Sequence, residues 1–280
     1  MTTYHTVQID HLKIFYREAG DPTKPTMLLF HGFPSASHMF RDLMPLLADH
    51  FHLIAPDFPG FGQSSMPNHA DFTYTFTHLA SVMTDFITHL QLTKFYLYVF
   101  DYGAPIGFHI ATAHPDWIQG IVSQNGNVYQ EGLGAKWATR QDFWDHPTAA
   151  KRASYRTAFA PETIKGQYLT GTPANSVSPD GYTLDIAYTQ RQNYADNQLD
   201  LIFDYQNNIR AYPAFQRYLR EFQPKLLAIW GKNDPSFIFP GAQAFTRDDP
   251  NATVRAVDSG HFALESHALP IAQAILRTFA

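Results

Sequence analysis

Short apolar runs and stretches with helical spacing alternate along the first 126 residues. Residues 26–30 (TMLLF) and 94–100 (KFYLYVF) are mostly apolar or aromatic runs of strand length. Between them, one stretch carries apolar side chains at helical spacing: Leu79, Val82, Met83, Phe86, Ile87 and Leu90. Strands that alternate with helices in this way are typical of parallel βαβ units. We therefore predict an α/β fold with a mostly parallel sheet flanked by helices.

The alternation is interrupted between residues 127 and 222. This segment lacks strand signals, and its pattern predicts helices at 139–144, 147–159, 161–170, 184–192, 197–208 and 212–222. The alternation of strands and helices then resumes with segments at 225–230, 252–257 and 264–279. We expect an inserted helical cap at 127–222, on a core formed by 1–126 and 223–280.

The composition narrows the possible functional classes. With 280 residues, 45% of them hydrophobic and 16% charged, the chain can bury a sizeable core. A formal net charge of −5 without a basic block argues against nucleic acid as a partner. No apolar run approaches the roughly 18 to 20 residues of a membrane span. There is no cysteine, so disulfides and thiolate chemistry are excluded. The first residues lack a signal-peptide pattern, and we expect a cytoplasmic protein.

Asp101 stands where a predicted strand meets a predicted helix. The run 94–100 leads into Asp101, and Tyr102-Gly103-Ala104 forms a tight turn before a helix-like stretch. This is the strand–turn–helix context of a nucleophile elbow, with a carboxylate in place of the usual hydroxyl. An aspartate nucleophile forms an ester with the alkyl part of a substrate. Its targets are therefore carbons that bear a leaving group or belong to a strained ring.

Two further residues complete a catalytic set. Asp234 follows the strand at 225–230, and His261 follows the last strand. Taken singly, each of the three is also compatible with a capping, turn or surface role, but their order of nucleophile, acid and base is that of a hydrolase triad. Asp101 would attack carbon. His261, oriented by Asp234, would take a proton from the water that cleaves the ester. We expect neither a metal nor a cofactor.

Cleavage of that ester creates an oxyanion, which backbone N–H groups must stabilise. The candidates are the N–H of Tyr102, directly after the nucleophile, and the N–H of Phe33 in the segment HGFP. Pro34 lacks an N–H and stiffens the same turn. Asp57 also follows a strand, and we expect it to hold its loop rather than to take part in catalysis.

Together these motifs resemble the α/β-hydrolase superfamily, in the branch of the epoxide hydrolases and haloalkane dehalogenases. The resemblance extends over HGFP at 31–34, DFPGFGQS at 57–64, VFDYG at 99–103, GKND at 231–234 and GHF at 260–262. It implies the α/β-hydrolase fold with an inserted helical cap, a covalent alkyl-ester intermediate, and no cofactor.

The choice between the two activities depends on the groups that stabilise the leaving atom. Dehalogenases of this branch hold the halide with N–H donors, a Trp after the nucleophile and an Asn or a cap Trp. This chain has Tyr102 and Phe33 at the corresponding positions, although Trp137 or Trp144 could supply one donor. Epoxide hydrolases protonate the opening oxygen with two cap tyrosines.

Two tyrosines of the predicted cap resemble that pair, Tyr205 in DYQN and Tyr155 in SYRTAF. We therefore predict a hydrolase that opens epoxides to vicinal diols, with a substrate pocket formed by Phe33, Trp144 and Phe262. The alternatives are a haloalkane dehalogenase and a non-catalytic small-molecule binding protein on the same fold. The expected partners are a small apolar substrate and water, and the chain is expected to be a monomer or a homodimer.

Overall fold

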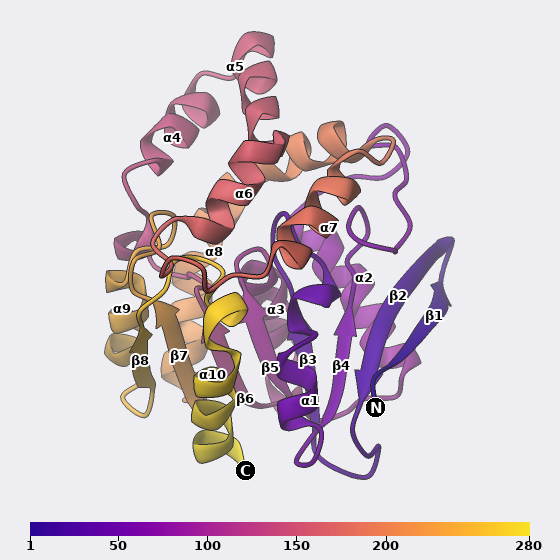
Figure 1. Ribbon diagram of the computed structural model, residues 1–280, viewed down its shortest axis with the longest axis vertical. Helices are drawn as coiled ribbons and strands as arrows, with labels where there is room; N and C mark the ends of the chain where they lie inside the picture. Colours follow the sequence, from indigo (N-terminus) through magenta and orange to yellow (C-terminus); the bar gives the residue numbers. More distant parts are fainter.

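The computed structural model describes residues 1–280 and is built around one eight-stranded sheet (Figure 1). The strands run in the spatial order β1-β2-β4-β3-β5-β6-β7-β8. Strands β4, β3 and β5 to β8 are mutually parallel, and the hairpin of β1 and β2 joins the sheet antiparallel to β4. The predicted mostly parallel sheet is thus confirmed. The strand bounds are Thr3–Ile9, Leu12–Ala19, Thr26–Phe30, His52–Pro56, Phe95–Phe100, Ile118–Gln124, Leu226–Gly231 and Thr253–Val257.

Helices cover both faces of the sheet. One face carries α1 (Leu43–Leu47) and α10 (Ala263–Phe279), and the other carries α2 (Phe76–His89), α3 (Gly103–Ala113) and α9 (Pro240–Asp248). Side chains of β3 alternate between the two layers: Leu28 and Phe30 pack toward α2 and α3, whereas Met27 and Leu29 pack toward α1 and α10. Because both faces are buried, the central strands read as continuous apolar runs.

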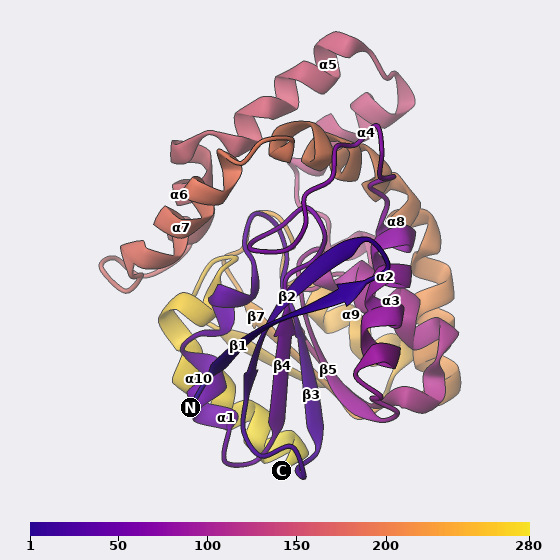
Figure 2. The ribbon, with the colours of Figure 1, turned by 90° about the vertical axis from the view of Figure 1, so that its right-hand side faces the viewer.

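The residues between β6 and β7 form the cap. Its helices are α4 (Trp137–Asp145), α5 (Ala149–Ser154), α6 (Pro161–Leu169) and α7 (Pro179–Thr189), with a 3₁₀ turn at Tyr155–Phe159. Figure 2 shows these helices arching over the edge of the sheet where the parallel strands end. Both chain termini lie at the opposite edge (Figure 1). The cap therefore covers the carboxyl ends of the strands, where ligand sites of such sheets lie.

The last cap helix, α8 (Tyr194–Phe222), differs from the prediction of two separate helices. It runs without interruption through Pro213, whose missing N–H would be expected to end it. Packing on both sides of the proline holds the helix together: it starts against α4 and α7 and then lies along α2, α3 and α9. Phe215 contacts Phe108 of α3, with ring centroids 5.6 Å apart. The second half of α8 thus flanks the sheet, so cap and core share one helix.

The segment 37–47 forms a 3₁₀ turn at Ser37–Phe40 followed by α1. Pro45 lies in the first turn of α1, a position that needs no N–H. No helix combines the length and the apolar character that crossing a membrane requires.

Candidate active site

Asp101 lies at a sharp turn between β5 and α3. Its φ of 47° is in the left-handed region, which Asp adopts more readily than most residues. The turn is crowded: a Cβ on Gly103 would lie 2.4 Å from the carbonyl oxygen of Phe30. The strand and the helix therefore hold the Asp101 carboxylate at the edge of the sheet, as the elbow motif predicts.

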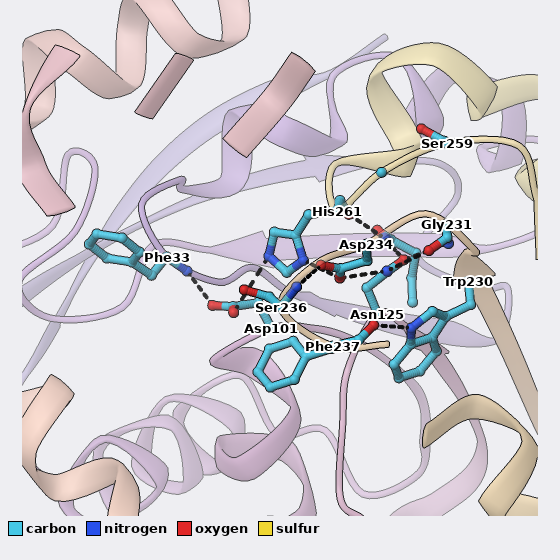
Figure 3. Close-up of polar contacts among 12 residues, drawn as sticks. Phe33, Asp101, Asn125, Trp230, Gly231, Asp234, Ser236, Phe237, Ser259 and His261 are labelled. Atoms are coloured by element: carbon cyan, nitrogen blue, oxygen red, sulfur yellow. Dashed lines mark hydrogen bonds and ion pairs between the residues drawn. The ribbon is translucent and has the colours of Figure 1, made fainter. Parts of the chain in front are cut away.

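The three predicted triad residues come together at this edge (Figure 3). His261 Nε2 lies 3.5 Å from Asp101 Oδ2, and its Nδ1 lies 2.6 Å from Asp234 Oδ2. All three side chains are buried. The imidazole is thus held between a nucleophile and an orienting acid, which is the arrangement that a base needs to act on water beside Asp101.

The two carboxylates control the protonation of His261. Burial by itself lowers the pKa of this imidazole, but the charges and hydrogen bonds of Asp234 and Asp101 outweigh burial and raise it to about 9. The two carboxylates therefore favour the protonated imidazolium in the resting site. Loss of either negative charge favours the neutral imidazole, which can act as a base.

Asp234 is itself held in place by neighbours. Its Oδ2 accepts a hydrogen bond of 2.8 Å from Asn125 Nδ2, and its Oδ1 accepts one of 2.7 Å from the Ser236 N–H. Asn125, which follows β6 with a φ of 46°, also accepts a hydrogen bond from the Gly231 N–H. The sequence analysis missed this role of Asn125. The available signal was a polar residue at the end of a buried strand.

One of the two predicted oxyanion donors already contacts the nucleophile. The Phe33 N–H donates a 2.7 Å hydrogen bond to Asp101 Oδ1 (Figure 3). Gly32 permits this approach, because a Cβ there would lie 2.3 Å from Asp101 Cβ. Tyr102, the other candidate, precedes the first turn of α3 directly after the nucleophile. The Phe33 N–H is thus positioned to stabilise negative charge on the Asp101 oxygen when the ester is cleaved.

Asp57 has the structural role that the sequence predicts. Its two carboxylate oxygens accept 2.7 Å hydrogen bonds from the N–H groups of Ser37 and Gln63. These bonds tie the loop after β4 to the segment that follows HGFP.

A cavity of about 230 Å³ lies above Asp101 and His261, beneath the cap. Its aromatic wall includes Phe33, Tyr102 and Trp137, together with Tyr155, whose hydroxyl is buried and has no hydrogen-bond partner. A hollow of about 290 Å³ adjoins it at His261 and has no hydrophobic residue in its wall. These volumes are at the small end of the range for ligand pockets, so the site suits a small substrate.

The cap contributes polar side chains to this cavity that the sequence analysis did not single out. They are Lys136, Thr139, Arg140, Thr157, Thr163 and Gln167. Spacing alone did not reveal them, because the first turn of α4 has no clear apolar face to indicate which side points inward. The wall thus differs in character from the pocket of Phe33, Trp144 and Phe262 that the sequence predicts for a small apolar substrate.

Three predicted residues lie behind the cavity wall. Trp144 donates its indole N–H to the Ile202 carbonyl at 3.1 Å, and Phe262 stacks on Tyr168 with ring centroids 3.8 Å apart. Neither lines the cavity, because cap packing turns Trp144 toward α8 and the start of α10 turns Phe262 toward α6. Of the predicted pocket residues, only Phe33 is on the wall.

Tyr205 is the third residue behind the wall. Its ring packs against Trp137 and Tyr102, and its hydroxyl lies 3.4 Å from that of Tyr212. Burial raises the pKa of Tyr205 first, and the Tyr212 hydroxyl and the charge of Asp101 raise it further. The phenol is therefore within electrostatic reach of the nucleophile, although other side chains separate it from the cavity.

Comparisons with known proteins agree with this fold. A family model described as alpha/beta hydrolase fold matches residues 25–268. The chain is 45% identical to Uncharacterized hydrolase YNR064C of Saccharomyces cerevisiae, over 99% of this chain and 97% of that protein. It is 28% identical to Haloalkane dehalogenase 2 of Mycobacterium tuberculosis, over 95% of this chain and 91% of that protein.

Two solved structures have the same fold. The haloalkane dehalogenase DbeA from Bradyrhizobium elkani superposes with a TM-score of 0.81 and 22% identity, covering 98% of this chain and 96% of its own. The epoxide hydrolase CorEH superposes with a TM-score of 0.81 and 18% identity, covering 100% of this chain and 99% of its own. Both therefore support the architecture of sheet and cap described above.

Proposed function

The chain belongs to the α/β-hydrolase fold family, and on that premise we propose that it opens epoxides to vicinal diols through an ester on Asp101. It is a hydrolase of the branch that contains haloalkane dehalogenases and epoxide hydrolases. The observation that carries the choice of epoxides is Tyr155, a residue of the cavity wall whose hydroxyl is buried and has no hydrogen-bond partner.

In the first step, an Asp101 oxygen attacks a ring carbon of the epoxide. The carbon–oxygen bond of the ring breaks, and its electron pair remains on the ring oxygen as an alkoxide. We propose that Tyr155 gives its proton to this alkoxide, with Tyr205 as a second phenol within electrostatic reach. The product of this step is a hydroxyalkyl ester of Asp101.

In the second step, water cleaves the ester. Esterification removes the negative charge of Asp101 and so lowers the pKa of His261, which then gives its proton to the Tyr155 phenolate left by the first step and can act as a base. His261 takes a proton from water, and the oxygen of that water attacks the carbonyl carbon of Asp101. The Phe33 N–H stabilises the resulting oxyanion. The oxyanion collapses, the bond between the carbonyl carbon and the alkyl oxygen breaks, and the hydroxyl proton of the new carboxyl group passes to the leaving alkoxide, which gives the diol and restores the carboxylate.

The contacts of the two cap tryptophans argue against a halide as the leaving group. Trp137 donates its indole N–H to the Ser236 carbonyl at 2.9 Å, and Trp144 donates its own to the Ile202 carbonyl. Neither indole N–H is free to bind a halide, and Tyr102 follows the nucleophile where an indole would be needed. The phenol of Tyr155, by contrast, suits protonation of an alkoxide.

Intact-mass spectrometry of the His261→Gln variant tests this proposal. Without the base, the Asp101 ester should form and persist on exposure to a panel of small epoxides. The expected result is a mass gain equal to the whole epoxide, mapped to Asp101. The control carries Asp101→Asn in addition and should gain no mass.

The same experiment separates the alternatives. A gain of only the alkyl group from a haloalkane panel, with halide released, would assign the chain as a haloalkane dehalogenase. No adduct from either panel would contradict both activities and favour a non-catalytic binding protein on this fold. Tyr155→Phe should reduce epoxide opening more than Tyr205→Phe, because Tyr155 lines the cavity and Tyr205 does not.

A further inference from the structure

Two cations face the catalytic cavity without a carboxylate partner. Lys136 and Arg140, from the first turn of α4, both line the wall above Asp101. Three other basic residues of the cap form ion pairs: Lys151 with Asp142, Arg152 with Asp200, and Arg156 with Asp196. Lys136 and Arg140 form none, and one guanidinium nitrogen of Arg140, Nη1, is buried with no hydrogen-bond partner. A buried cationic donor without a partner is costly unless a ligand completes it.

Burial lowers the pKa of Lys136, and the charges of Asp234 and Asp101 oppose that shift without forming an ion pair with either cation. Asp101 already faces the His261 imidazolium and accepts the Phe33 N–H. Asp234 is fully engaged by His261, by Asn125 and by the Ser236 N–H. The cap contributes no carboxylate to the wall of either hollow. The positive charge at the roof of the cavity is therefore in excess, in a chain whose formal net charge is −5.

The Arg140 side chain is also held in a defined position. Its guanidinium carbon lies 4.4 Å from the centroid of the Trp137 ring, which is a cation–π contact. Trp137 is itself fixed by its bond to the Ser236 carbonyl. A planar guanidinium held in this way suits a carboxylate, which it can bind with two parallel hydrogen bonds.

We propose that the substrate is a small epoxide that carries a carboxylate, which Arg140 and Lys136 hold while Asp101 attacks the ring. This inference rests on the proposed epoxide opening and specifies the substrate class of the same cavity. The carboxylate is unchanged by the reaction: oxirane-2-carboxylate (glycidate) and water would give glycerate. The small volume of the cavity fits such a molecule.

A matched pair of substrates tests the charge requirement. Glycidate and glycidamide have nearly the same shape and differ in charge, and their intrinsic reactivities cancel when variants are compared. We expect Arg140→Gln to lower the ratio of kcat/KM for glycidate to that for glycidamide by about 10- to 100-fold, the worth of a charged hydrogen bond. Lys136→Gln should lower the same ratio by less, because this residue is more exposed to water. Arg140→Lys should restore part of the ratio.

The control is Arg210→Gln, which removes one positive charge from an exposed part of α8 and should leave the ratio unchanged. Wild-type hydrolysis of neutral 1,2-epoxybutane tests the proposed function separately. Ligand-observed NMR with glycerate and glyceramide reports binding that does not depend on turnover. Stronger binding of glycerate that is lost in Arg140→Gln would support the anion site.

The outcomes separate the two proposals. If 1,2-epoxybutane is opened but the substrate ratio is the same in wild type, Arg140→Gln and Lys136→Gln, the carboxylate site is wrong and epoxide opening stands. If no epoxide is opened but glycerate binds through Arg140, the anion site stands and the proposed function is wrong. Lys136→Gln still tests the proposal if the Arg140 variant does not fold, since Lys136 is exposed and its replacement leaves the packing of the cap intact.

Discussion

Replacing Asp101 with Asn should lower the pKa of His261. The asparagine side chain has nearly the same shape but no negative charge, so it imitates the esterified nucleophile. Asn also tolerates the left-handed backbone that this position requires. The variant therefore isolates the electrostatic effect that we assign to ester formation.

The size of the change follows from the geometry. Two unit charges at the 3.5 Å that separates His261 Nε2 from Asp101 Oδ2 attract each other by about 5 kcal/mol at an effective dielectric constant of about 20. Measured effects of one opposite charge at such distances are smaller, roughly 1 to 3 pH units. We therefore expect the His261 pKa to fall from about 9 in the wild type by that amount. Asp234 remains in place and keeps part of the stabilisation.

The assay is a pH titration of isotope-labelled histidine by NMR, with the His261 signal identified by its absence in His261→Gln. Asp258→Asn is the matched control, because it removes an exposed carboxylate three residues from His261 that does not contact the imidazole. The control should leave the His261 pKa at its wild-type value. An unchanged or higher pKa in Asp101→Asn would refute the reasoning, since the charge of the nucleophile would then not govern the base.

Three other perturbations test the same site. Folding raises the pKa of His261 from the ordinary 6.5 to about 9, so its contribution to the free energy of unfolding is present below pH 6.5 and lost as the pH rises through 9. Chemical denaturation should show this loss in the wild type, and a similar loss in His261→Gln would contradict it. Asn125→Ala should lower the free energy of unfolding by about 2 to 4 kcal/mol, because it removes the hydrogen bond to Asp234 and places alanine in a strained backbone conformation. Asn125→Gly should lower the free energy of unfolding by about 1 to 2 kcal/mol less than Asn125→Ala, because glycine relieves the backbone strain. Equal losses in the two variants would exclude a contribution from that strain. Gly32→Ala places a Cβ 2.3 Å from Asp101 Cβ, so kcat/KM should fall by about 100-fold or more, and near-normal turnover would show that the nucleophile tolerates displacement.

The sequence by itself determined the order of the elements and the chemistry at the strand ends. Continuous apolar runs mark strands buried on both faces, and each run ends in a residue whose chemistry can be read directly, as at Asp101 and Asp234. Parallel strands bring those ends to one edge, so the triad could be predicted without coordinates. The roles of Gly32 and Phe33 could also be predicted from the sequence, since a turn directly after a buried strand carries the N–H groups that face the nucleophile.

Only the tertiary structure decided what surrounds the triad. Helical spacing in the cap does not specify which side chains point inward, because cap helices pack on one another as well as on the core. Trp144 and Tyr205 thus lie behind the wall, whereas Lys136 and Arg140 line it. The bond from Asn125 to Asp234 joins residues 109 positions apart, a distance that no local pattern spans. The catalytic residues lie in short local motifs that can be recognised in the sequence. The residues that select the substrate come from segments that meet only in the folded chain.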